Sequence, residues 1–139
     1  MKSLLVIGCL LLVADVIRAE TDVLEVLREQ VESCAEDQNI PTSELSKFHD
    51  IELEGDDRKK MGCLKACILK RTEIFDGTTI NPDKYQEIAE KVLGDDTDKI
   101  AKGMEDMKAC VEEVSVKEIP DECDAAYEFT RCVMLKRDS

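Results

Sequence analysis

Six cysteines constrain the fold of this chain more than any other feature of its sequence. The six are Cys34, Cys63, Cys67, Cys110, Cys123 and Cys132. The gaps between consecutive cysteines contain 28, 3, 42, 12 and 8 residues. A seventh, Cys9, lies in the apolar N-terminal segment. An even number of cysteines in a short exported chain is typical of a disulfide framework. Three crosslinks of about 2–4 kcal/mol each rival the whole stability of a small domain, so a chain held in this way could keep a hollow interior.

The N-terminal segment predicts export. A lysine precedes the apolar run Leu4–Val13, and a small residue stands before the expected cut. Asp15 and Arg18 interrupt this run too early for a membrane-spanning helix, which needs about 20 apolar residues. We therefore expect a signal peptide at 1–19 and a single helical domain at 20–139. The protein should be secreted into extracellular fluid, where disulfides persist, with no stable membrane insertion.

Composition argues against several classes of function. The formal charge of −13 disfavours binding to nucleic acid or to anionic membranes. His49 is the only histidine and Cys63-x-x-x-Cys67 has no matching second pair, so a zinc site is not expected. The acidic run 95–98 lacks the glycine and the final glutamate of an EF-hand loop. We expect no catalytic residues, no metal and no cofactor.

Helical periodicity runs through every long segment, and no segment alternates like a strand. Asn81-Pro82 has the form of an N-cap followed by proline at the first helical position. Gly55-Asp56-Asp57 should end a short helix, and Asp76-Gly77 should form a turn. The sequence predicts an all-α, six-helix disulfide-crosslinked bundle with helices near 22–36, 42–51, 58–72, 82–94, 96–114 and 121–133, followed by a short tail.

Helix geometry limits the disulfide pairings without fixing them. Cys63 and Cys67 are four residues apart and project from one face of a helix. A bond between them would hold no other element, so each is expected to reach a different helix. Cys123 and Cys132 are nine residues apart and point to opposite sides of the last helix. Two different elements can therefore hold that helix.

The cysteine spacing resembles that of the insect odorant-binding and pheromone-binding protein family. The match lies in the three-residue gap after Cys63, the eight-residue gap after Cys123, the export signal and the helical pattern. The resemblance implies six helices around an apolar ligand cavity and the pairings Cys34–Cys67, Cys63–Cys123 and Cys110–Cys132. It also implies a carrier in olfaction, which transports small hydrophobic odorants or pheromones through aqueous lymph to a chemoreceptor.

Three other functions fit parts of the sequence. A related carrier could work in a reproductive, salivary or haemolymph fluid. A saposin-like membrane-active module is also helical with six cysteines, but this chain lacks the paired cysteines two residues apart near the termini that such modules have. An enzyme is disfavoured, since the lone histidine has no partner in a recognised motif. The carrier could be a monomer or a weak homodimer.

Candidate ligand-binding residues follow from the helical faces and from the resemblance. Methionines at helical spacing are core residues by default, but they suit an adaptable pocket wall because the thioether is flexible. Residues 133–135 could cover the pocket as a flap, and Thr130 or Tyr127 could bind a polar end. Few aromatic residues favour flexible, chain-like ligands. The expected lining is Leu27, Leu69, Ile74, Phe75, Ile88, Val92, Met104, Met107, Phe129, Val133 and Leu135.

Overall fold

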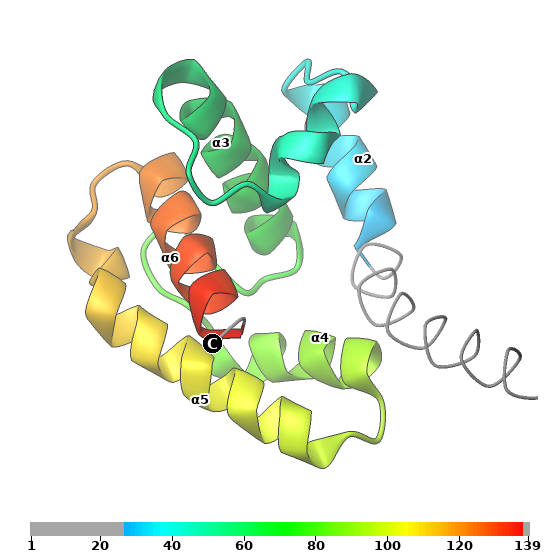
Figure 1. Cartoon of the computed structure of the whole chain (residues 1–139), viewed down its shortest axis with the longest axis vertical. Helices are drawn as coiled ribbons and strands as arrows, with labels where there is room; N and C mark the ends of the chain where they lie inside the picture. The colour runs from blue at the N-terminus through cyan, green and yellow to red at the C-terminus, as the bar shows by residue number, and fades with distance from the viewer. Residues whose placement is uncertain (1–26, 138–139) are drawn as a thin grey trace, which may run out of the picture.

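The computed structural model of the chain describes residues 27–137, and within this range the fold is all-α (Figure 1). No named strand occurs there, and a single isolated bridge joins Phe75 and Ile80. The expected signal peptide lies outside the described residues. Five α-helices and two 3-10 helices follow in the order α2 (Arg28–Asp37), η1 (Thr42–His49), α3 (Gly55–Arg71), α4 (Pro82–Leu93), α5 (Thr97–Val114), η2 (Val116–Glu118) and α6 (Glu122–Arg137).

Local sequence signals explain where α4 and α5 begin and end. The Asn81 side chain accepts hydrogen bonds from the backbone N–H groups of Asp83 and Lys84, at 3.0 and 3.3 Å. Pro82 occupies the first turn, as the Asn-Pro pair predicts. Gly94 ends α4 with φ +61°, a backbone conformation that glycine adopts without steric cost. The side chain of Asp96 caps α5 by accepting from the N–H of Lys99 at 3.2 Å.

Three details differ from the sequence predictions. The segment expected as a short helix to residue 51 is a 3-10 helix that ends at His49. Gly55 opens α3 instead of marking a break, because its φ of +61° turns the extended chain into the helix. The tail expected after residue 133 instead continues α6 to Arg137, so residues 133–135 are helical. No helix within residues 27–137 combines the length and the apolarity needed to cross a membrane.

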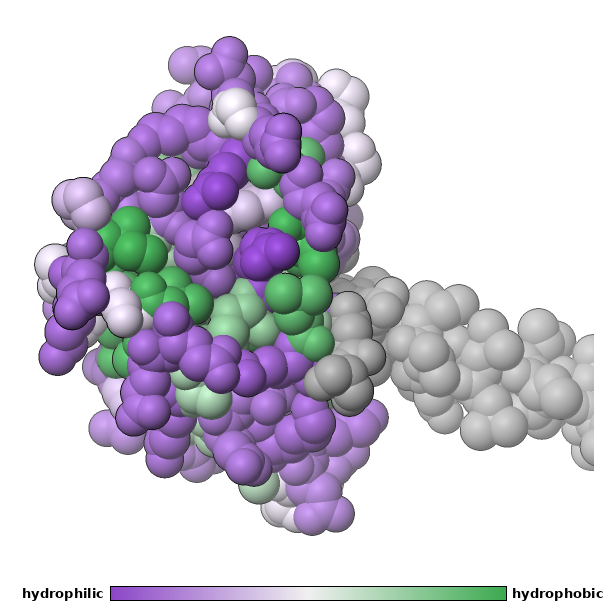
Figure 2. Space-filling view, turned by 60° about the vertical axis from the view of Figure 1, so that its left-hand side comes forward, coloured by the Kyte–Doolittle hydropathy of each residue, from purple (hydrophilic) through white to green (hydrophobic). Residues whose placement is uncertain are grey.

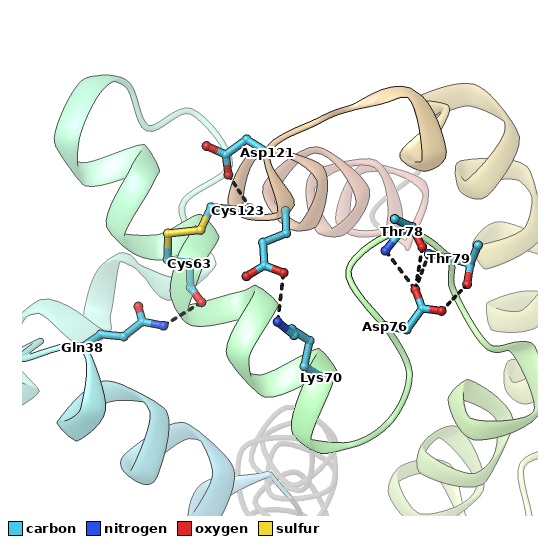
Figure 3. A network of polar contacts seen from close by, with 9 residues as sticks. Gln38, Cys63, Lys70, Asp76, Thr78, Thr79, Asp121 and Cys123 are labelled. Carbon is cyan, nitrogen blue, oxygen red and sulfur yellow. Dashed lines mark hydrogen bonds and ion pairs between the residues drawn. A yellow bond between two sulfur atoms is a disulfide. The ribbon is translucent and has the colours of Figure 1, made fainter.

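Three disulfides join four of the helices. Cys34–Cys67 links α2 to α3, Cys63–Cys123 links α3 to α6, and Cys110–Cys132 links α5 to α6. These are the pairings that the family resemblance implies. As expected from the spacing of Cys123 and Cys132, two different helices, α3 and α5, are crosslinked to α6. In Figure 3, Cys63–Cys123 bridges the facing sides of α3 and α6, and the Gln38 amide of the chain after α2 donates to the Cys63 carbonyl at 2.9 Å.

The closest approach of α3 to α6 depends on Gly62. A Cβ atom at this position would stand 2.4 Å from the Cys123 carbonyl oxygen, which belongs to the backbone and cannot move aside cheaply. We expect Gly62→Ala to lower the free energy of unfolding by about 1–3 kcal/mol, because overpacking forces the helices apart. Chemical denaturation measured by circular dichroism would show this loss.

Gly103 provides the matched control for Gly62. It is also helical, in α5, and a Cβ atom there meets nothing within 4 Å. Gly103→Ala should leave stability unchanged or raise it by up to about 1 kcal/mol, since alanine favours the helix. Equal losses for the two variants would contradict the close contact at Gly62.

Two apolar cores flank α3. The α2–α3 cluster comprises Val31, Cys34, Ala35, Ile40, Met61, Leu64 and Ile68. The half-buried side chains around it are Leu27, Leu45, Phe48, Leu53 and Cys67. The α5–α6 cluster comprises Ala66, Phe75, Met107, Cys110, Val116, Ala125, Ala126 and Phe129. Since α3 contributes to both cores, it is the central element of the described fold.

Candidate functional site

The α5–α6 cluster has a sealed base and an apolar rim. At the base, Met107 and Phe129 are each only 1 % exposed. The apolar side chains packed around this base are half-buried: Leu69, Ile80, Tyr85, Met104, Val111, Val114, Ile119, Cys132 and Val133. One turn separates half-buried Met104 from buried Met107 on α5, so exposure falls steeply along a single helix face. The cluster is thus a buried apolar core with a half-buried apolar periphery, which makes it the candidate surface for an apolar ligand.

Helix α4 contributes Tyr85 to this rim. Its apolar residues lie on one face, which normally packs into a core. None of the residues of α4, all of which the structure describes, is fully buried. Tyr85, Ile88 and Val92 are instead half-buried. Figure 2 shows hydrophobic side chains gathered across the middle of one face of the molecule, with hydrophilic regions above and below.

The α3–α4 loop places Phe75 in the base. The Asp76 carboxylate accepts from the backbone N–H groups of Thr78 and Thr79 at 2.9 and 2.7 Å, and from both hydroxyls (Figure 3). These donors, Thr79 first, hold the pKa of Asp76 below its usual range. The expected Asp-Gly turn is present, with Gly77 at φ +104°. The turn returns the chain toward α4 while Phe75 stays buried.

Tyr85 is the polar group that the sequence analysis missed at this site. Its ring packs edge-on against Phe129, with ring centres 6.5 Å apart. Burial, with the charge of Asp106 second, raises the pKa of Tyr85, so its hydroxyl remains protonated and able to donate. The signal was present in the sequence, because Tyr85 lies three and seven residues before Ile88 and Val92 on one helix face.

The two donors suggested from sequence have other partners. The Thr130 hydroxyl donates to the Ala126 carbonyl of its own helix at 2.8 Å. The Tyr127 hydroxyl accepts from the backbone N–H of Leu53 at 2.9 Å, between α6 and the segment before α3. Neither residue belongs to the α5–α6 cluster or to the half-buried side chains around it.

The structure brings together six of the eleven expected lining residues. Those in or around the α5–α6 cluster are Leu69, Phe75, Met104, Met107, Phe129 and Val133. Ile88 and Val92 lie on α4 without joining the cluster, and Ile74 is buried in the loop that follows α3. Leu27 packs against the α2–α3 cluster instead, since α2 is crosslinked to α3. Leu135 is 43 % exposed on α6.

A groove of about 350 Å³ between α5 and α6 borders the α5–α6 cluster at Val114 and Cys132 and has a more polar character. Its charges are largely compensated, since Lys136 pairs with Glu113 at 3.1 Å and Arg58 pairs with Glu128 at 2.7 Å. Its lining is Glu113, Val114, Glu128, Arg131, Cys132, Leu135 and Lys136. Cys110, Glu113 and Cys132 approach one another closely enough to hold a metal ion, but both sulfur atoms are committed to a disulfide. This groove is therefore unlike an apolar ligand site.

Comparisons with known proteins agree with this architecture. The model of the PBP/GOBP family matches residues 18–136. Pheromone-binding protein Gp-9 of Solenopsis globularia littoralis is 29 % identical over 94 residues, which cover 68 % of this chain and 58 % of that protein. The alignment thus spans less than two thirds of the relative. An odorant-binding protein of Drosophila melanogaster has a similar fold, with a TM-score of 0.61 and 23 % identity over 84 % of this chain and 96 % of its own.

Proposed function

This chain belongs to the PBP/GOBP family, and from that premise we propose that it is a secreted, non-enzymatic carrier of small hydrophobic odorants or pheromone-like ligands. The ligand would bind over the α5–α6 cluster and travel with the protein through an aqueous fluid to a chemoreceptor. The observation that carries this proposal is the sealed apolar base beneath a half-buried apolar rim. Such a surface can shield an apolar molecule that water would otherwise exclude.

The energetics of burial support a chain-like ligand. Burying a methylene group is worth about 0.8 kcal/mol, so ten to twelve carbons contribute about 8–10 kcal/mol before entropic costs. Micromolar affinity corresponds to about 8.2 kcal/mol. The wall offers aliphatic and thioether groups, including Met104 and Met107, which adapt to flexible chains. Tyr85 supplies a donor that could orient a hydroxyl or carbonyl at one end of the chain.

The same ligand-binding surface would also suit a carrier in a non-sensory fluid. A carrier in a reproductive, salivary or haemolymph fluid would use the same apolar surface for other small apolar molecules. The tissue in which the protein is made separates this alternative from a sensory role. We propose a monomer or a weak homodimer in either setting.

The variant Val133→Asp tests the proposed site. Val133 packs on the α5–α6 cluster, so a carboxylate there would meet the apolar ligand and lose its hydration. We expect at least tenfold weaker binding of a C10–C12 alcohol, which corresponds to about 1.4 kcal/mol. Displacement of a fluorescent apolar probe would measure the affinity, and circular dichroism would verify that the variant is folded.

Leu135→Asp is the matched control on the same helix. Leu135 is exposed and lies outside the cluster, so the same new charge should change alcohol binding less than twofold. A folded Val133→Asp variant with wild-type affinity would remove the α5–α6 cluster from the proposal. Equal weakening by both variants would point to the overall charge instead of the site.

A further inference from the structure

A buried lysine lies away from the α5–α6 cluster, beneath the segment that joins η1 to α3. Lys65 of α3 is 2 % exposed, and its ammonium has no hydrogen-bond partner among the described residues. Its Nζ atom lies 5.2 Å from the ring centres of both Phe48 and Tyr127. An ammonium with three unused donors is rarely buried without a function, because its desolvation is unfavourable.

Burial shifts Lys65 toward the neutral amine, while its cation–π contacts with Phe48 and Tyr127 act in favour of the ammonium. Burial lowers its pKa to about 8, while the negative charge of Asp50 acts in the opposite direction. Other charged or titratable groups near the site include Arg58, which lies 4.9 Å from the Tyr127 ring centre, and His49, whose ring centre lies 5.4 Å from that of Phe48. A pKa near 8 leaves a larger fraction of Lys65 uncharged at pH 7.5 than is found for an ordinary lysine. A neutral amine in apolar surroundings is a nucleophile toward carbonyl groups.

We propose that Lys65 is a reversible covalent attachment site for small hydrophobic aldehydes. The Nζ lone pair attacks the carbonyl carbon, both amine hydrogens pass to the carbonyl oxygen, and that oxygen leaves as water. A carbon–nitrogen double bond remains, so the step needs no oxidant or reductant. The aromatic rings of Phe48 and Tyr127 would pack against the first carbons of the aldehyde.

The segment of residues 42–54, here called the strap, provides the access route. No residue of η1 within it is fully buried. It is held to α6 by two polar contacts at 2.9 Å, from the Leu53 N–H to the Tyr127 hydroxyl and from Arg131 Nε to the Ile51 carbonyl. Such contacts can open locally and reform. Closure of the strap would then exclude water and slow the hydrolysis of the imine.

Reductive trapping tests this proposal on the wild-type protein. The protein is incubated with hexanal and sodium cyanoborohydride at pH 7.5, and the modified lysines are mapped by peptide mass spectrometry. The reductant delivers hydride to the imine carbon and fixes the adduct as a secondary amine. We expect Lys65 to be modified at least tenfold more than Lys70, an exposed lysine of the same helix. The N-terminal amine, with an ordinary pKa of about 8, is the internal reference for an exposed amine.

The proposal would be overturned if the exposed lysines were modified in proportion to their solvent exposure and Lys65 were not modified. Lys65→Arg keeps the cation and should remove the adduct from the peptide containing residue 65 without increasing modification at Lys70. If this variant fails to fold, the wild-type map still decides the question. The carrier proposal is tested separately, because alcohols cannot form imines. Normal alcohol displacement with no adduct at Lys65 would refute the covalent site alone.

Discussion

Removal of the Cys63–Cys123 disulfide, by changing both cysteines to serine, should lower the free energy of unfolding by about 4 kcal/mol. This bridge encloses the longest loop of the three, with a sequence separation of 60 residues. Crosslinking a longer loop restricts the unfolded chain more, and the loop-length relation gives about 4 kcal/mol for this separation. The bridge also joins α3 to α6 where Gly62 allows their backbones to meet. Urea denaturation followed by far-UV circular dichroism measures the loss.

The Cys110–Cys132 bridge supplies the comparison. It spans 22 residues and links α5 to α6, so its removal should cost about 3 kcal/mol. We expect the two losses to keep this order. A variant lacking Cys63 and Cys123 that is as stable as the wild type would show that the packing of α3 on α6 alone holds the fold.

Replacement of Phe129 by alanine should lower the free energy of unfolding by about 3–5 kcal/mol. Phe129 is 1 % exposed at the base of the α5–α6 cluster, and its ring meets the ring of Tyr85 edge-on. The variant loses the burial of a large aromatic side chain and leaves a void that its neighbours fill only in part. The same denaturation experiment measures this change, and binding of a C12 alcohol should weaken with it because the ligand loses the floor of its site.

Leu135→Ala is the control for the truncation of Phe129. Leu135 lies on the same helix and is 43 % exposed, so its truncation should change stability by less than about 0.5 kcal/mol. A loss below about 1 kcal/mol for Phe129→Ala would mean that the base of the cluster is not packed as described. The proposed ligand-binding site would then have to lie elsewhere in the protein.

Local signals predicted the parts of the fold that depend on neighbouring residues. Asn81-Pro82 located the start of α4, because capping needs only the side chain and the next few N–H groups. Asp76-Gly77 located the turn for the same reason. The disulfide pairing, in contrast, could not be predicted from neighbouring residues alone. Helix geometry left several partners for each cysteine, and only the family resemblance selected Cys34–Cys67, Cys63–Cys123 and Cys110–Cys132, which the structure contains.

Long-range packing explains what the sequence could not reveal. A helical face predicts one buried side, but α3 packs against α2 and against α6 at once. Lys65 is therefore buried although it stands among the lysines of a helix with weak amphipathic character. The sequence places Leu27 in the ligand site from its helical face and the family resemblance, whereas the structure packs it against the α2–α3 cluster. Neither the burial of Lys65 nor the packing of Leu27 can be predicted from the sequence of one helix, because both depend on how the helices pack together.

The 42-residue gap between the third and fourth cysteines leaves α4 as the one α-helix within residues 27–137 that carries no cysteine. Tyr85 of this helix lies at the rim of the proposed site, and no side chain of α4 is fully buried. If the ligand binds there as proposed, substitutions along α4 would alter which guest is accepted while the sulfur-linked framework stays intact. Ligand choice and crosslinking would then be assigned to different helices of the same chain.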